Sequence, residues 1–292
     1  MPLLYAGLGE TIAEKAGVIN IGMEGVMLSG AFFSFAGAWL SGNLAVGLLA
    51  GIAGGLAVAA LHAFLCVQLG QDQSVSGLAI NMLMLGVTSF LFKWMGQGQS
   101  YQQIKPLPSV AIPVLSRIPL IGDGFFNRDV LTYVFYGLVI LAAVFYKKTN
   151  LGLSFSAVGE NPKAAESAGI PVHKVQWIAM ILNGILGGIG GAFLVLVSLG
   201  VFTDDMISGR GYIALAAVIL GKYSPIGMFG ACLLFGLTNA LQIRLQTVGV
   251  SISPYLLATL PYLITLLAMI VSAKRNVTPE ALGRPYVRGS RD

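Results

Sequence analysis

The sequence predicts an all-α fold, a polytopic membrane helix bundle of about eight to nine spans, from three observations. Only 10% of the 292 residues are charged, whereas a soluble domain carries roughly 25%. Hydrophobic residues make up 56% of the chain, and the mean hydropathy is +0.81. The apolar residues also form long stretches of the length that crosses a bilayer. These features exclude a soluble enzyme, a disordered chain and a nucleic-acid binder.

Eight apolar stretches are candidates for membrane spans, because a spanning helix takes roughly 17–25 residues. They lie at 26–42, 44–69, 74–96, 130–146, 175–198, 204–221, 226–243 and 254–273. A ninth, shorter stretch at 2–14 is interrupted by Glu10 and Glu14. The stretches 26–42 and 204–221 are short and contain glycines, so we expect broken or tilted helices there. Together the stretches form a single transmembrane domain over 1–292.

The basic residues predict the orientation, because they concentrate on the cytoplasmic side of membrane proteins. With the loop 147–174 inside, the tail 274–292 is cytoplasmic and the loop 97–129 extracellular. Eleven of the 17 basic residues then lie inside: Lys15, Lys147, Lys148, Lys163, Lys174, Lys222, Lys274, Arg275, Arg284, Arg288 and Arg291. The side of the N-terminus stays open, because it depends on whether 2–14 crosses.

The loop 97–129 contains four prolines and is too polar to span the bilayer. We expect it to cap the outer mouth or contact an extracellular partner, with a passive connector as an equal alternative.

The order of the stretches predicts an internal duplication. A short piece, a glycine-broken span and two full spans over 2–96 correspond to the segment 175–273. Gly22-Met23-Glu24-Gly25 and Gly209-Arg210-Gly211 would then begin equivalent helices. Because the span 130–146 separates the halves, they would have opposite topology, as in many transporters.

Glycines recur every four residues in two of the stretches, at Gly47, Gly51 and Gly55 and at Gly184 and Gly188. Small residues at this spacing line one helix face and let two backbones approach closely. We therefore predict tight helix packing at these faces.

The segment 159–171 predicts a short helix outside the bilayer. Asn161 is a good N-cap and Pro162 suits the first helical position. Gly169 can adopt the left-handed conformation that ends a helix, and Pro171 prevents its continuation. Because so short a helix is unstable alone, a second element must hold it. It is either a docking helix for a cytoplasmic motor or a capped connector.

Several motifs resemble those of one family, the branched-chain amino acid/ribose/nucleoside permease superfamily of ABC importers. The motifs that carry the resemblance are Glu14-Lys15-Ala16-Gly17-Val18-Ile19-Asn20-Ile21-Gly22-Met23-Glu24-Gly25, Ser156-Ala157-Val158-Gly159-Glu160-Asn161-Pro162, Gly209-Arg210-Gly211-Tyr212 and Leu282-Gly283-Arg284-Pro285-Tyr286. The resemblance covers nearly the whole chain and is closest to the nucleoside branch, located in the bacterial cytoplasmic (inner) membrane.

The resemblance implies a permease subunit that has partners and no ATPase site of its own. The partners are an ABC ATPase, a second permease subunit and an extracellular solute-binding lipoprotein. The segment 161–168 would be the coupling helix. The residues expected to contact the ATPase are Glu160, Asn161, Pro162, Ala164, Ala165, Ala168 and Gly169.

Polar residues within spans are costly and are therefore candidates for a translocation path. The candidates are Asn81, Asn183, Asn239 and Gln242. An amide can bind a ribose hydroxyl or a base edge without a fixed charge, although it can equally join two helices. Glu24 and Arg210 are the candidate structural ion pair.

Three functions are candidates for this chain: an ABC importer permease, an ion-coupled secondary transporter and an intramembrane enzyme. The enzyme has little support, because the sequence has two isolated histidines, no HExxH motif and no paired intramembrane aspartates. We expect no catalytic residues, no metal site and no cofactor. Among neutral solutes, nucleosides, purine bases and simple sugars stay open.

Overall fold

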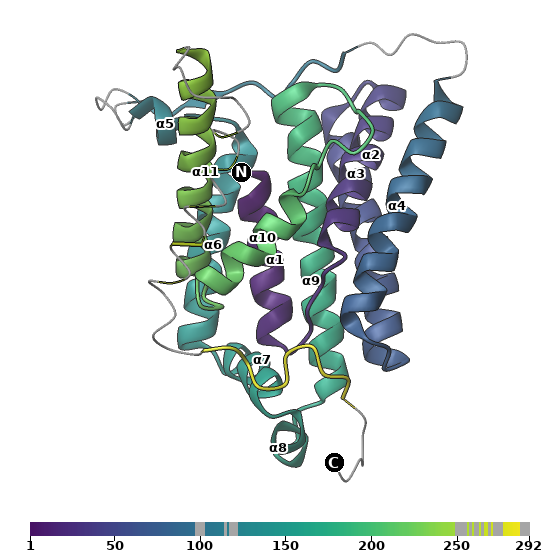
Figure 1. The fold of residues 1–292 in the computed structure, drawn as a ribbon, viewed down its shortest axis with the longest axis vertical. Coiled ribbons are helices and arrows are strands. Elements are labelled where there is room, and N and C mark those ends of the chain that lie inside the picture. The colour runs from purple at the N-terminus through teal and green to yellow at the C-terminus, as the bar shows by residue number, and fades with distance from the viewer. Residues whose placement is uncertain are drawn as a thin grey trace.

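The computed structural model describes residues 1–96, 103–113, 116, 122–248, 256, 259, 263, 266, 267, 270 and 277–286. These residues are mostly helical (Figure 1). The helices of the first half are α1 (Pro2–Lys15), α2 (Met23–Ser41), α3 (Leu44–Ala63), its π-helical continuation η1 (Phe64–Gln68) and α4 (Gln73–Met95). Then come β1 (Val110–Ala111), α5 (Gly122–Phe126), β2 (Asn127–Arg128), α6 (Val130–Lys148), α7 (Asn150–Glu160), α8 (Pro162–Ser167), α9 (Val172–Phe193), its π-helical continuation η3 (Leu194–Leu199), α10 (Arg210–Leu220) and α11 (Pro225–Thr247).

Within the described residues, six helices are long and apolar enough to cross a membrane: α2, α3 with η1, α4, α6, α9 with η3, and α11. The prediction of a polytopic helical bundle is confirmed, and six of the eight expected stretches correspond to these helices. The stretch 204–221 differs, because only α10 forms there. Asp205, Ser208 and Gly209 have positive φ angles, which break the helix before Arg210. The stretch 254–273 lies almost wholly outside the described residues.

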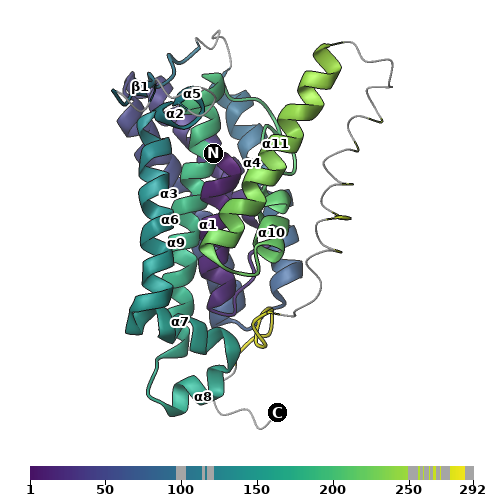
Figure 2. The ribbon, with the colours of Figure 1, turned by 90° about the vertical axis from the view of Figure 1, so that its left-hand side faces the viewer.

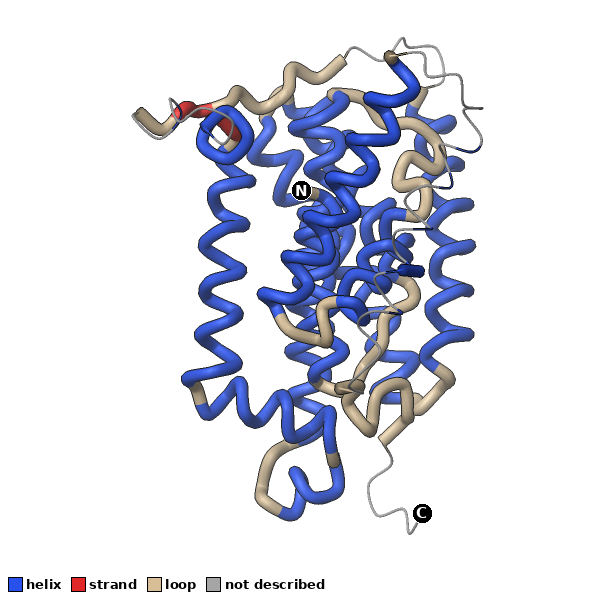
Figure 3. The backbone as a smooth tube through the Cα atoms, turned by 60° about the vertical axis from the view of Figure 1, so that its left-hand side comes forward, coloured by secondary structure: helices blue, strands red, loops and turns tan. Residues whose placement is uncertain are grey.

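The bundle has two distinct ends (Figures 1 and 3). At one end α7 and α8 project beyond the spans, and we call this the α8 end. The segment 277–286 lies at the same end, where the Ala281 N–H donates to the Gly159 carbonyl at 3.0 Å. At the opposite end, the loop end, β1 and β2 form a two-residue antiparallel pair beside α5 (Figure 2).

Helix α1 lies in the centre of the bundle (Figure 2). Every residue from Leu4 to Glu14 is buried, including the acidic Glu10 and Glu14. Near its start the Tyr5 hydroxyl donates to the Leu131 carbonyl of α6 at 2.6 Å. A helix of 14 residues is about 21 Å long, which is less than the roughly 30 Å apolar core of a bilayer. Helix α1 is therefore a central helix of less than full membrane length.

Helices α2, α3 and α9 pack through their glycine faces, as the spacing predicts. A Cβ atom at Gly55 of α3 would lie 2.5 Å from the Cα of Gly188 in α9, and one at Gly30 of α2 would lie 2.5 Å from the Gly188 carbonyl oxygen. Since these are backbone atoms, no side-chain adjustment relieves the overlap. The predicted tight packing is confirmed at this three-helix contact.

Candidate functional site

The connection between α1 and α2, residues 16–22, is non-helical backbone that runs from the α8 end back into the bundle (Figure 1). Such backbone needs internal hydrogen-bond partners within a membrane bundle. Side chains of α3 and α4 supply three of them. Gln73 Oε1 accepts from the Ile19 N–H at 2.8 Å, His62 Nε2 lies 3.1 Å from the Ile19 carbonyl, and Asn81 Nδ2 donates to the Ile21 carbonyl at 2.9 Å.

Three fully buried polar residues join α1, this connection and α9. Glu10 Oε1 accepts from the Asn20 N–H at 2.7 Å, and its Oε2 accepts from Asn183 Nδ2 at 2.8 Å. Asn20 Nδ2 donates to Asn183 Oδ1 at 2.7 Å and closes the triangle. All three side chains are fully buried, so these bonds take the place of bonds to water. The triangle therefore holds the connection between α1 and α2 at a fixed position against α9.

The start of α10 meets the start of α2 through Glu24. Glu24 Oε1 accepts from the Gly209 N–H at 2.7 Å, and Oε2 accepts from the Gly211 N–H at 2.6 Å. Backbone N–H groups at a helix start are unpaired within the helix and attract negative charge. A Cβ atom at Gly211 would lie 2.5 Å from the backbone nitrogen of Glu24, so this close approach requires glycine.

This contact differs from the expected ion pair between Glu24 and Arg210. The Arg210 guanidinium donates instead to the carbonyls of Met206 and Ile207, at 3.1 and 2.8 Å. The two motifs do meet, but the carboxylate binds the backbone on either side of Arg210. The start of α10 has no side-chain cap, so its backbone N–H groups are unpaired and point toward the Glu24 carboxylate. This explains why Glu24 binds the backbone rather than the Arg210 side chain.

Helices α2 and α10 start at the same junction and run toward opposite ends. The last turn of α2 lines a hollow at the loop end together with Gln103 and Pro108. Just beyond α10, the Tyr223 hydroxyl donates to Thr278 Oγ1 at 3.3 Å, at the α8 end. The junction is therefore a place where two helix starts face each other inside the bundle.

The four candidate path residues fall into two groups. Asn183 belongs to the buried triangle, and Asn81 bonds to the Tyr212 hydroxyl at 2.8 Å and accepts from the Gly25 N–H at 2.8 Å, besides its bond to Ile21. Asn239 and Gln242 lie on α11, where Asn239 is exposed and Gln242 half-buried. The structure thus brings the first two to the junction and the second two to one outlying helix.

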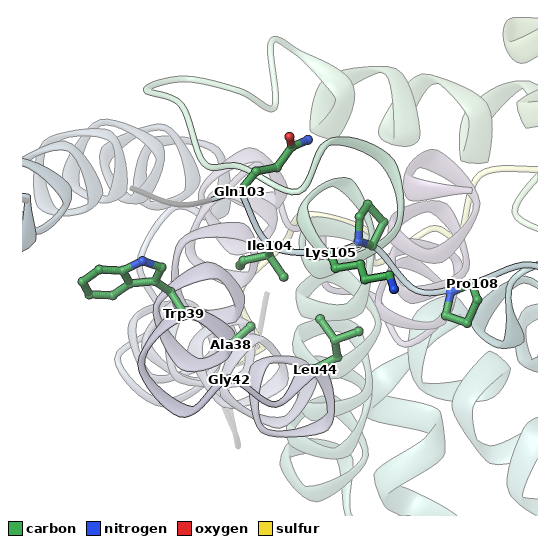
Figure 4. A pocket seen from close by; sticks show the side chains of 9 residues that line it. Ala38, Trp39, Gly42, Leu44, Gln103, Ile104, Lys105 and Pro108 are labelled. Atoms are coloured by element: carbon green, nitrogen blue, oxygen red, sulfur yellow. The ribbon is translucent and has the colours of Figure 1, made fainter. Parts of the chain in front are cut away.

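The segment 103–108 lies across the loop end of α2 and α3 and borders an open hollow of about 530 Å³ (Figure 4). The Ile104 N–H donates to the Gly200 carbonyl at 2.8 Å, and the Leu107 N–H donates to the Leu196 carbonyl at 2.8 Å. Trp39 and Lys105 are among the lining residues. The described part of the long loop therefore covers helix ends rather than standing away from them.

The short helix predicted within 159–171 is confirmed as α8. Asn161 Oδ1 accepts from the Ala164 N–H at 3.0 Å, Pro162 is the first helical residue, and Gly169 has a φ of +85°. Glu160, Asn161, Ala164, Ala168 and Gly169 are exposed, whereas Ala165 is buried. The preceding helix α7 is not foreseen by the sequence analysis, and it carries α8 away from the spans (Figure 1).

Two residues of the junction were missed at the level of sequence. Asn20 is one of them, and its position as a lone amide between Ile19 and Ile21 is a signal of a buried polar contact. Gln73 follows Asp72, whose carboxylate accepts from the Ser74 and Val75 N–H groups as the N-cap of α4. Nothing in this local pattern indicates that Gln73 reaches Ile19.

Discontinuous helices whose starts meet within a bundle of membrane spans are typical of transport proteins. The fold and the junction therefore define a multi-pass membrane transport component. The chain belongs to the family described as "Branched-chain amino acid transport system / permease component", whose model matches residues 1–273.

Similar proteins include several permeases. The guanosine ABC transporter permease of Bacillus subtilis is 37% identical over 99% of this chain and 94% of its own length. The nucleoside ABC transporter permease of Lactococcus lactis is 34% identical, covering 98% and 93%. The putative glucose ABC transporter permease of Haloferax volcanii is 36% identical, covering 98% and 94%. No solved structure matches the chain.

Proposed function

We propose that this chain is the permease subunit of an ABC importer that moves nucleosides across the cytoplasmic membrane of a bacterium. The observation that carries the proposal is the match along nearly the whole chain to guanosine and nucleoside permeases. A separate ATPase subunit supplies the energy. The exposed α8, held beyond the spans by α7, supports a contact with such a subunit.

The importer contains a second permease and an extracellular solute-binding lipoprotein. Two nucleoside ABC transporter permeases of one Lactococcus lactis strain resemble this chain, at 34% and 29% identity. This pairing supports a heterodimer of permeases. The lipoprotein docks at the loop end, where the segment 103–108 and Trp39 border the hollow.

The α8 end faces the cytoplasm in this proposal, which makes the C-terminus cytoplasmic. The lysines of 147–174 and the described Arg284 of the tail lie at this end, in agreement with the positive-inside rule. The six spans, the shorter α1 and α10, and the apolar stretch 254–273 then make up nine segments. The junction of α2 and α10 marks the contact between two inverted halves.

The translocation path runs along the side of α11 that carries Asn239 and Gln242. Asn81 and Asn183 already hold the broken helices in place, so we assign them a structural role beside the path. An amide can bind a ribose hydroxyl or a base edge and release it again, because it carries no fixed charge.

Uptake into proteoliposomes that contain the permeases and the ATPase tests the proposed solute. We expect ATP-dependent uptake of labelled guanosine that other nucleosides compete with and that glucose does not affect. Competition by glucose in place of nucleosides would contradict the substrate. Uptake that continues without ATP and stops when ion gradients collapse would identify an ion-coupled secondary transporter instead.

Replacing Ala165 with proline is expected to uncouple ATP hydrolysis from uptake. The Ala165 N–H donates to the Asn161 carbonyl at 2.9 Å, and proline removes this donor and clashes with the preceding turn, at a cost of about 3 kcal/mol. A distorted α8 can no longer transmit a displacement. We expect uptake per ATP hydrolysed to fall at least about tenfold, while labelled guanosine still binds the receptor.

Ala165→Ser is the matched control, because it keeps the N–H group and nearly the same volume. It should retain coupling close to that of the wild type. Normal ATP-driven uptake by Ala165→Pro would contradict the role of α8 as the coupling helix.

A further inference from the structure

The segment 277–286 crosses the α8 end and contacts elements from both halves of the chain. We call it the C-terminal strap. The Tyr223 hydroxyl after α10 donates to its Thr278, and Tyr286 near its end contacts α8 and the start of α9. Pro285 lies near Gly70 in the connection between η1 and α4. The described strap therefore joins both halves of the bundle at the end that carries α8.

Two backbone hydrogen bonds anchor the strap independently of its side chains. The Ala281 N–H donates to the Gly159 carbonyl at the end of α7 at 3.0 Å. The Gly283 N–H donates to the Gly17 carbonyl in the connection between α1 and α2 at 3.3 Å. Gly17 and Gly283 have φ angles of +83° and +76°, which a residue with a side chain rarely adopts. The strap thus binds the connection between α1 and α2 directly.

The strap holds α8 through Tyr286. Its hydroxyl donates to the Glu166 carboxylate of α8. Its ring packs edge-on against His173 at the start of α9, with the centroids 5.6 Å apart. Tyr286 and Ile170 are both half-buried against the apolar cluster that contains Ala165. One side chain therefore touches the short helix and the span that follows it.

Helix α8 depends on such contacts for its position. Its six residues form fewer than two turns, and a helix of this length does not persist alone in water. Of these residues Ala165 is the buried one. A hydrogen bond to a charged group is among the stronger single contacts available to so small an element.

The contacts continue from the strap into the junction. Gly17, which accepts from Gly283, lies three residues before Asn20 along the chain. Asn20 is in turn bonded to Glu10 and Asn183. A contiguous series of hydrogen bonds and covalent links therefore runs from Glu166 through the strap to the buried triangle.

We infer that the C-terminal strap is a positioning element that fixes α8 through the bond between Tyr286 and Glu166 and carries its displacement to the α1–α2 connection. This inference rests on the proposed function, in which α8 meets an ATPase. Tyr286 and Glu166 are positioning residues in this arrangement. The strap is then the second route from α8 into the bundle, besides the chain connections through α7 and α9.

Amide hydrogen exchange of the complete purified permease tests the positioning itself, without any ATPase. Tyr286→Phe removes the hydroxyl and keeps the ring on His173. We expect exchange of the Ala165 and Ile170 amides, which bond within and just after α8, to rise about tenfold. Glu166→Ala removes the acceptor of the same bond and should raise the exchange equally. Glu166→Gln keeps an oxygen acceptor, so its exchange should stay close to that of the wild type.

The reconstituted transporter tests the second half of the inference. In Tyr286→Phe and Glu166→Ala, we expect uptake per ATP hydrolysed to fall at least about threefold while the ATPase still copurifies with the permease. Glu166→Gln should recover most of the ratio. A purely structural role would lower the amount of assembled transporter and leave this ratio unchanged.

Tyr133→Phe is the matched control, since it deletes a tyrosine hydroxyl bond to the Val110 carbonyl at the loop end. It should change neither α8 exchange nor coupling. Wild-type exchange in both Tyr286→Phe and Glu166→Ala would overturn the positioning role, and an unchanged uptake-to-ATP ratio would overturn the transmission. Failure of the wild-type permease to bind an ATPase would overturn the proposed function and leave the exchange result standing.

Discussion

Replacing Gly191 with valine is expected to prevent the bundle from assembling. A Cβ atom at Gly191 of α9 would overlap the carbonyl oxygen of Met27 and lie 2.8 Å from the Ala31 nitrogen, both in α2. Because these are backbone atoms, no rotamer change relieves the clash. Helix α9 would have to move away from α2 and lose the packing that drives helix association in lipid.

The expected cost exceeds about 3 kcal/mol, the upper range for overpacking that side chains can absorb. Total stabilities are only about 5–15 kcal/mol, so little folded protein should remain. Thermal unfolding and size-exclusion chromatography in detergent measure the effect. Gly137→Val on α6 is the control, because nothing lies within 4 Å of a Cβ atom there. A Gly191→Val protein as stable as this control would contradict the close contact.

Replacing Glu24 with alanine is expected to release α10 from the start of α2. The change leaves the N–H groups of Gly209 and Gly211 without the carboxylate that now binds them. Each hydrogen bond to a charged group contributes roughly 1.5–3 kcal/mol, so the loss is about 3–6 kcal/mol at a partly buried site. We expect a lower unfolding temperature and loss of uptake.

A charge-reversal pair distinguishes this contact from an ion pair. Glu24→Arg combined with Arg210→Glu should remain as defective as Glu24→Arg alone, because the wild-type carboxylate binds backbone groups and the guanidinium binds carbonyls. Glu24→Gln keeps an oxygen acceptor and should retain part of the stability. Rescue by the double reversal would show that the two side chains do interact.

Features that depend on neighbouring residues were predictable from the sequence. The N-cap of α8 is one example, because Asn161 needs only to reach the Ala164 N–H three residues later. The glycine faces are another, because spacing along one helix defines which residues share a side. The unpredicted α7 is amphipathic and joins two longer segments, so composition alone did not separate it from the loop around it.

Contacts between residues that lie far apart in the chain could not be predicted from the sequence. Asn20 meets Asn183 across 163 residues, and Glu24 meets Gly211 across 187. The sequence showed which polar groups lie in apolar surroundings and must find partners, but several partners were chemically possible for each. A carboxylate can bind a guanidinium or a pair of N–H groups equally well in principle.

Composition and local spacing were sufficient to specify a multi-pass bundle, the capped α8 and the tight helix faces. These depend on solvation in lipid and on contacts within a few residues. The packing of the helices decided the long-range contacts. These are the bonds of Glu24 to the α10 backbone, the bonds of Asn81 and Asn183 around the α1–α2 connection, and the bond of Tyr286 to Glu166. Where helices break inside the bundle, unpaired backbone groups are more numerous than charged side chains and become the partners of polar residues. The positions of these backbone groups are set only when the whole chain has folded.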